Sequence, residues 1–182
     1  MGRQPLEGVK VVDFGWIAVV PISCTYLSQH GAEVIRIESL TRPDEIRVGG
    51  PPFKDNIPGV NRSAYFANYN AGKYGVSLNL KHPKGVEIAK RLVSRADIAV
   101  EGFTAGTMER LGLGYEELRK VNPDIIMLST CIHGQTGPHA MHPTLGTQLT
   151  ALAGFVHLTG WPDRGPGMPF GAYTDTVVPQ FV

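Results

Sequence analysis

Short apolar runs alternate along this chain with stretches whose apolar residues recur at helical spacing. The apolar runs cover residues 9–14, 33–38, 75–80, 97–101 and 124–130. The helical stretches cover residues 21–30, 83–95 and 115–120. Strands that alternate with helices in this way form right-handed βαβ units around a mainly parallel sheet. The pattern therefore predicts an α/β domain, in which residues 124–130 form a buried strand.

Four segments that follow the predicted strands should border one crevice. They are residues 15–20, 38–40, 101–106 and 130–137. Ligands of parallel α/β sheets bind outside the carboxyl ends of the strands. Glycine and proline also cluster around residues 41–62 and 134–171, which predicts two long loops. Long loops in a compact domain are usually functional or form interfaces.

The composition argues against several classes of partner. The 182 residues fit one domain, and their formal charge of +1 comes without a basic stripe or an acidic tail. We therefore expect neither nucleic acid nor a membrane surface as a partner. No apolar run is long enough to span a bilayer, and no signal-type apolar segment follows the N-terminus. Cys24 and Cys131 form no disulfide framework and suit a reducing compartment, so we expect a cytoplasmic protein.

The individual motifs leave the chemistry open. No glycine pattern follows a strand as it does in a dinucleotide site or a P-loop. His133, His139 and His142 lack zinc-site spacing, so we interpret them as solvated loop residues and predict no metal. Cys131 has no base partner that the sequence can name, and we interpret it as a small strand-end residue rather than a nucleophile. Lys73 is either a solvated loop lysine or a point charge that holds a phosphate.

The C-terminal residues begin another apolar element. Residues 174–182 have the pattern of a helix capped by Asp175, and the sequence stops within it. We therefore expect a truncated chain rather than a complete one.

Six segments together resemble the family III (CaiB/BaiF-type) CoA-transferases. They are PLEGVKVVD at 5–13, PISCTYLSQHGAEVIRIE at 21–38, NYNAGKYGVSLNLK at 68–81, EGFTAG at 101–106, LGLGYEELRKVNPD at 111–124 and GQTGP at 134–138. They occur in the order that this family shows, and the resemblance runs from about residue 5 to residue 182.

The resemblance implies a Rossmann-like fold with helices on both faces of a mainly parallel sheet. Residues 1–182 would form the N-terminal part of a large CoA-binding domain, and the family's small domain would be absent from this chain. Family members interlock with a second, homologous subunit as hetero- or homodimers. They take an acyl-CoA as substrate and need no metal. In their mechanism a carboxylate attacks the thioester and forms an aspartyl mixed anhydride.

The resemblance also implies which residues contact CoA. They are Val20, Ser39, Lys73, Phe103, Thr104, His133, Gly134 and Gln135. Thr104 stands where the family has an arginine that reaches the CoA phosphates, and Val20 should crowd a backbone that approaches the ligand. Gln135 either offers its amide to the acyl or CoA group or belongs to a simple tight turn.

The expected nucleophile is missing from the matching position. The family has an aspartate eight positions before a helix glycine, and counting back from Gly154 gives Gly146. We therefore predict no catalytic residue in this chain. Asp175 matches another aspartate of the family, for which we expect a capping or structural role.

Three hypotheses on function follow. The first is a non-catalytic subunit of a heteromeric CoA-transferase, whose partner supplies the aspartate. The second is an active CoA-transferase or acyl-CoA isomerase, which requires a carboxylate in the crevice near residues 134–137. The third is a non-enzymatic acyl-CoA-binding or scaffold module. We favour the first on the sequence, because several CoA-contact residues and the nucleophile are lost together.

Overall fold

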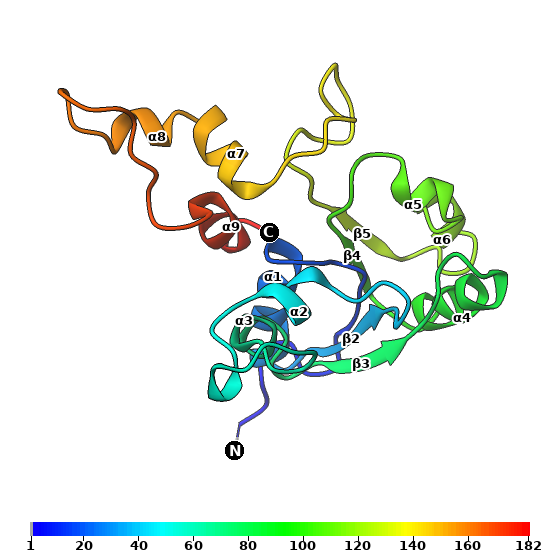
Figure 1. Cartoon of the computed structure of the whole chain (residues 1–182). Helices are drawn as coiled ribbons and strands as arrows, with labels where there is room; N and C mark the ends of the chain where they lie inside the picture. The colour runs from blue at the N-terminus through cyan, green and yellow to red at the C-terminus, as the bar shows by residue number, and fades with distance from the viewer. Residues whose placement is uncertain (1) are drawn as a thin grey trace.

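Five short strands form one parallel sheet in the computed structural model, which describes residues 2–182 (Figure 1). The strands are β1 (Lys10–Asp13), β2 (Glu33–Glu38), β3 (Tyr74–Ser77), β4 (Ile98–Glu101) and β5 (Ile126–Ser129). Their order across the sheet is β3-β2-β1-β4-β5, and every neighbouring pair is parallel. In the central strand, Val12 pairs with Ile35 on one side and with Ala99 on the other. The predicted parallel α/β sheet is confirmed.

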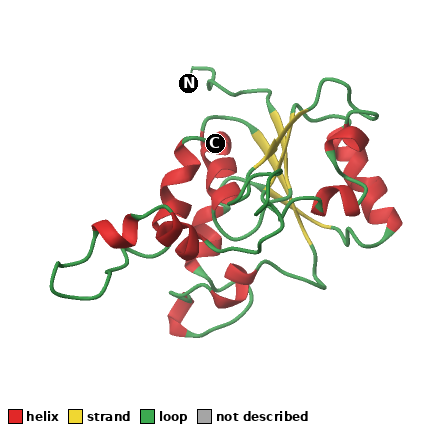
Figure 2. Ribbon diagram, turned by 90° about the horizontal axis from the view of Figure 1, so that it is seen from above, coloured by secondary structure: helices red, strands yellow, loops and turns green. Residues whose placement is uncertain are grey.

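Helices cover both faces of this sheet (Figure 2). They are α1 (Val19–Gln29), α2 (Glu45–Gly49), α3 (Ala64–Tyr69), α4 (Pro83–Val93), α5 (Thr107–Arg110), α6 (Tyr115–Leu118), α7 (Gly146–Leu152), α8 (Phe155–Leu158) and α9 (Tyr173–Val177), with 3₁₀ turns η1 (Lys54–Asn56) and η2 (Val178–Gln180). Helices α4, α5 and α6 lie on one side of the sheet, and α1, α3 and α9 lie on the other (Figure 1). This arrangement confirms the Rossmann-like fold.

The core has two halves because successive strand residues point to opposite faces. Val11 and Val100 pack with Val20 and Cys24 of α1 in one hydrophobic cluster. Their sequence neighbours Val12 and Ala99 pack in the other cluster, beneath the buried residues of α4, α5 and α6. Each central strand therefore contributes side chains to both clusters. A shift of one residue in strand pairing would move these side chains to the wrong face, so the alternation fixes the register of the sheet.

Strand β5 differs from its prediction. It pairs only with β4 and forms an edge of the sheet, and its first residue, Ile126, is 62% exposed. The predicted buried strand is therefore wrong in its burial but right in its type. An apolar run does not distinguish an edge strand from a central one, because the order of strands in the sheet determines whether a strand has one neighbouring strand or two.

The two segments predicted as long loops contain short helices. Residues 41–62 include α2 and η1, and residues 134–171 include α7 and α8. Helix α2 begins at Asp44, whose carboxylate accepts a hydrogen bond from the Ile46 N–H at 3.1 Å. The glycine and proline content therefore predicted irregular backbone correctly, but it did not predict the short capped helices within these segments.

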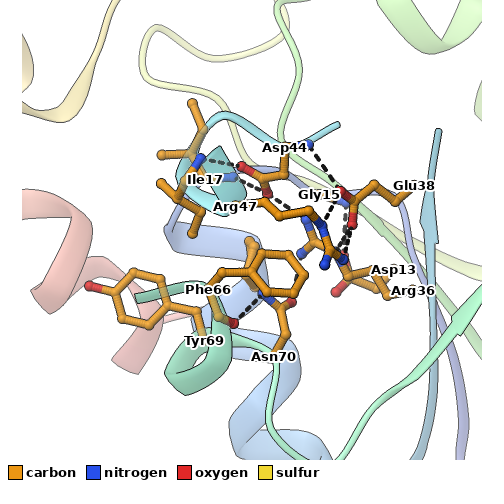
Figure 3. Close-up of polar contacts among 12 residues, drawn as sticks. Asp13, Gly15, Ile17, Arg36, Glu38, Asp44, Arg47, Phe66, Tyr69 and Asn70 are labelled. Atoms are coloured by element: carbon orange, nitrogen blue, oxygen red, sulfur yellow. Dashed lines mark hydrogen bonds and ion pairs between the residues drawn. The ribbon is translucent and has the colours of Figure 1, made fainter. Parts of the chain in front are cut away.

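A network of charged side chains fastens the first of these segments to the sheet (Figure 3). Arg47 donates two hydrogen bonds to the Glu38 carboxylate, each at 2.7 Å. Arg36, whose side chain is 3% exposed, is ion-paired with the fully buried Asp44. The Arg47 guanidinium also lies over the Phe66 ring, 3.6 Å from its centroid. These contacts hold α2 and α3 against the carboxyl end of β2.

Candidate functional site

A cavity of about 300 Å³ opens at the carboxyl ends of β1, β4 and β5. It is lined by residues 16–20 and 130–133, by Gly102 and Thr104, by several residues of the segment 140–149, and by Asp175 and Val178. Three of the four segments that were expected to share a crevice therefore border it. The fourth, at the end of β2, borders a second cavity of about 510 Å³ instead.

Asp175 supplies the carboxylate of the first cavity. Among residues 2–182, no other aspartate or glutamate lines it. Asp175 lies in the first turn of α9, but the helix is capped at Ala172 without a side-chain hydrogen bond, so the predicted capping role is wrong. Burial raises the pKa of the Asp175 carboxyl above its usual value. A half-buried carboxylate with a raised pKa in a cavity is typical of a reactive group.

Gly146 lies directly beside this carboxylate. It is buried at the start of α7, and a Cβ atom built on it would meet the Asp175 Oδ1 at 2.1 Å. Real Cβ atoms do not approach oxygen so closely, so a side chain at position 146 and Asp175 in its present place exclude each other. The space that a side chain at position 146 would need is thus filled by the Asp175 carboxylate from α9.

The loop between β1 and α1 forms one wall of the cavity. Ile17 has a φ of 66°, a conformation that β-branched residues rarely adopt. Its N–H donates a hydrogen bond to the Asp44 Oδ2 at 2.9 Å (Figure 3). Asp44 is buried and also ion-paired with Arg36, so the charged network holds this wall in a strained shape.

Val20 belongs to the same loop and helix and is one of the residues that line the cavity. Val20 is 1% exposed and packs in the core with Val11 and Val34. A Cβ on Gly15 would lie 2.2 Å from the Val20 Cβ, so Gly15 leaves the space that the valine fills. The Val20 side chain is therefore held mostly in the core, and its expected crowding of a ligand stays a prediction.

Lys73 is committed to a buried ion pair and is not free for a phosphate. Its Nζ donates to the Asp13 Oδ2 at 2.9 Å, the Pro21 carbonyl at 2.8 Å and the Asn70 Oδ1 at 3.1 Å. An ammonium group has three protons, and these contacts use all of them. The Lys73 side chain is 2% exposed. The interpretation of Lys73 as a solvated lysine is therefore wrong, and its occupied protons argue against the phosphate role.

Thr104 and His133 do line the cavity, as expected for residues near the ligand. The His133 Nε2 is 2.8 Å from the Thr144 Oγ1, so the two side chains share a hydrogen bond. His139 and His142 lie nearby, with ring centroids about 6 Å apart. Within residues 2–182, no group of three or more histidine, cysteine, aspartate or glutamate side chains could hold a metal.

Cys131 also lines the cavity, but its surroundings do not activate it. Burial and the neighbouring Glu101 raise the pKa of the Cys131 thiol, which opposes formation of the reactive thiolate. This agrees with its interpretation as a strand-end residue.

The remaining predicted contact residues lie outside the first cavity. Phe103 packs edge-on against Trp16, with ring centroids 5.8 Å apart. Ser39 borders the second cavity. Gly134 forms a left-handed turn with φ 77°. The Gln135 Nε2 donates to the Glu101 Oε1 at 3.2 Å, so its amide joins the 134–138 turn to the end of β4.

The fold and the cavity define an α/β protein with a cavity at the carboxyl edge of a parallel sheet, beside one carboxylate, which is where such sheets bind ligands. Residues 6–182 match the model of CoA-transferase family III, and the chain belongs to that family. The resemblance drawn from the sequence is thereby confirmed. CoA-transferases use CoA thioesters as substrates.

The chain is 36% identical over 178 residues to succinyl-CoA:glutarate CoA-transferase of Mus musculus, an alignment that covers 98% of this chain and 40% of that protein. It is 39% identical over 157 residues to the succinyl-CoA:(R)-benzylsuccinate CoA-transferase subunit BbsE of Thauera aromatica, covering 86% of this chain and 38% of the relative. A crystal structure of a CAIB/BAIF family protein from Brucella suis matches with a TM-score of 0.91 and 35% identity, over 99% of this chain and 47% of that one.

The chain thus spans less than half the length of these relatives. One of them is named as a subunit, which indicates assembly with a partner in that protein. None of the helices in residues 2–182 has the length and apolar character needed to cross a membrane.

Proposed function

We propose that this chain carries the nucleophile of an active CoA-transferase, which moves CoA between an acyl-CoA thioester and a carboxylic acid. The observation that carries this proposal is the Asp175 carboxylate, which stands in the cavity at the strand ends in the space left by Gly146. The sequence favoured a non-catalytic subunit because no carboxylate was found at position 146. Asp175 removes that reason.

The first chemical step follows from the carboxylate. An Asp175 oxygen attacks the thioester carbonyl carbon, the carbon–sulfur bond breaks, and CoA leaves as its thiolate. The product on the enzyme is a mixed anhydride, which stays activated for transfer to an incoming acid. Partial burial strengthens the nucleophile, because the same desolvation that raises the pKa of Asp175 makes its oxygen more basic.

The cavity suits the reacting end of the substrate. Its volume of about 300 Å³ lies at the small end of ligand sites, so it takes an acyl group and thioester while most of CoA lies outside it. The hydroxyl of Thr104 and the imidazole of His133 supply polar groups, and Leu149 and Val178 supply an apolar surface. Residues 1–182 form part of the CoA-binding domain in this proposal.

A second candidate function is a supporting subunit of a heteromeric enzyme. Thr104 in place of a phosphate-binding arginine, the lack of a free Lys73 and the subunit name of the Thauera relative favour it. In either case we propose a homologous CoA-transferase subunit as partner in an interlocked hetero- or homodimer. A cytoplasmic location, with neither nucleic acid nor membrane as partner, is part of both proposals. A purely acyl-CoA-binding module has less support, because binding alone needs no carboxylate beside the acyl site.

The test is CoA exchange by the full-length protein. Succinyl-CoA and acetyl-CoA serve as donors with labelled acids, among them the glutarate and benzylsuccinate of its relatives' names. The protein is assayed alone, as Asp175→Asn, and mixed with a homologous subunit. Activity of the protein alone that is lost in Asp175→Asn supports the first proposal. Activity only in the mixture, and unchanged by Asp175→Asn, supports the second.

A further inference from the structure

Two buried threonine hydroxyls converge on the carbonyl oxygen of Gly146. Thr150 Oγ1 donates to it at 2.8 Å from within α7, and Thr174 Oγ1 donates to it at 2.9 Å from α9. The Thr174 N–H in turn donates to Thr150 Oγ1 at 3.4 Å. Thr150 is fully buried and Thr174 is 7% exposed. A small polar cluster therefore joins the first turns of the two helices.

Each hydroxyl has a single proton and lies within hydrogen-bond distance of the Gly146 carbonyl oxygen. The two hydroxyl oxygens also lie 3.2 Å apart, so either hydroxyl can donate to the other, and the two threonines and the carbonyl form one connected cluster. A buried hydroxyl without a partner destabilises the protein, so neither threonine is free to turn away from Gly146. The cluster therefore ties the segment before Asp175 to the residue beside the Asp175 carboxylate.

We propose that Thr150 and Thr174 are positioning residues, which set where the Asp175 carboxylate points into the cavity. This inference rests on the proposed function of Asp175. Thr174 precedes Asp175 in the chain, and Gly146 is the residue whose missing Cβ leaves room for the Asp175 oxygens. Fixing Thr174 to the Gly146 carbonyl thus fixes the backbone of Asp175 against the surface that its side chain faces.

The threonine-to-valine substitution removes the hydroxyl and keeps the shape. In the full-length protein, we expect Thr174→Val to lower kcat about 10- to 100-fold, since a small misplacement of a reacting group costs up to about 100-fold. The KM for the donor thioester should stay within about twofold, because the cluster acts on the nucleophile and not on binding. Thr174→Ser, which keeps the hydroxyl, should restore most of kcat. Thr150→Val should act in the same direction.

Thr176→Val is the matched control. It makes the same change in the same helix, at an exposed threonine whose hydroxyl bonds only to the Tyr173 carbonyl at 2.8 Å. We expect its kcat to equal that of the parent. Melting temperatures of all variants are measured together with the kinetics. If Thr174→Val does not fold, Thr150→Val and Thr150→Ser take its place. A fall in the kcat of Thr150→Val that Thr150→Ser reverses then supports the positioning role, and an unchanged kcat refutes it.

The outcomes separate this inference from the proposal beneath it. If Asp175→Asn keeps full activity, the proposed function fails and the threonines have no nucleophile to position. If Asp175→Asn is inactive while Thr174→Val and Thr150→Val keep the parent kcat, the nucleophile stands and the positioning role is refuted. A fall in melting temperature without a fall in kcat also refutes it, because the cluster then only fastens the two helices.

Discussion

Gly146 and Asp175 share one space: a Cβ atom on Gly146 would lie 2.1 Å from the Asp175 Oδ1. The two residues come from helices α7 and α9, which contact each other in the fold. The carboxylate of the cavity therefore depends on the smallest side chain at position 146. The glycine at position 146 therefore leaves room for a carboxylate from α9.

Substitution of Gly146 should damage activity more than stability. In Gly146→Ala the new methyl group displaces the Asp175 carboxylate, and we expect kcat to fall about 10- to 100-fold. Alanine also restricts the unfolded chain more than glycine does, by about 0.4–1 kcal/mol, which offsets part of the steric cost to folding.

The matched control for this change is Gly165→Ala. Gly165 has no atom near the position of its missing Cβ, so its alanine variant should keep the parent kcat. Steady-state kinetics and thermal unfolding check both variants. A Gly146→Ala protein as active as the parent would show that Asp175 is not the reacting group.

The pH dependence of the reaction should report the raised pKa of Asp175. The carboxylate must be ionised to attack, so kcat/KM falls as the pH falls through this pKa. Burial raises it, so the acid limb should lie above the value of about 3.9 that is usual for aspartate. A pH–rate profile on the parent protein measures this. A rate that stays flat down to about pH 4 contradicts the assignment.

Lys73 should matter for folding and not for CoA binding. Removing one partner of a buried ion pair costs about 3–5 kcal/mol, because the other charge is left buried. Lys73→Met leaves the Asp13 carboxylate buried without its charged partner. The free energy of unfolding of this variant in urea should therefore fall by about that amount. The double variant Asp13→Asn/Lys73→Met should recover part of the loss.

The control for this experiment is Lys81→Met at an exposed lysine, which should change the stability little. In whichever lysine variants remain folded, the dissociation constant for CoA should match that of the parent. A folded Lys73→Met protein with parent stability and much weaker CoA binding would restore the phosphate-binding role.

Glu38 should give the protein stability that acid removes. Burial alone raises the pKa of Glu38, but the hydrogen bonds and charge of Arg47, with the Asp44 N–H and Arg36, outweigh it and hold the pKa below its usual value. A lowered carboxyl pKa contributes stability above the unfolded-state pKa, and this is lost as the pH falls through the folded-state value. At neutral pH, Glu38→Gln should therefore be less stable by about 1.5–3 kcal/mol, the range for hydrogen bonds to charged groups.

This difference between the parent and Glu38→Gln should shrink as the pH is lowered below about 4.3, the usual value for glutamate. Urea unfolding at a series of pH values measures it. A difference that is constant with pH would mean that the charge of Glu38 contributes nothing.

The strands were predictable because their patterns are local. Residues 33–38 were predicted as a strand with the bounds that β2 has, since alternation and the glycine stop at residue 31 lie in one short segment. The edge position of β5 was not predictable, because the same apolar run serves a central or an edge strand. The exposed Ile126 follows from the order of the sheet and not from its own segment.

The residues of the candidate site were predictable only where they lie in a segment that follows a strand. Thr104 and His133 lie in the segments 101–106 and 130–137, which the rule for strand ends placed at the crevice, and the family resemblance named these two residues within them. Asp175 joins the cavity through the packing of α9 on α7, and Lys73 is buried by Asp13 from another strand. Counting positions along the chain does not reveal such contacts. The one local signal for Asp175 was an acidic residue in the first turn of a helix, which equally describes a cap.

The most direct test of the account is to trap the acyl-enzyme. The full-length protein is incubated with succinyl-CoA or acetyl-CoA and then with hydroxylamine, which converts a carboxyl group held as an anhydride into a hydroxamate. Peptide mass spectrometry then locates the modified residue. We expect a hydroxamate on Asp175 that depends on the thioester and is absent from Asp175→Asn. A thioester-dependent hydroxamate on another residue, or CoA transfer that persists in Asp175→Asn, would contradict it.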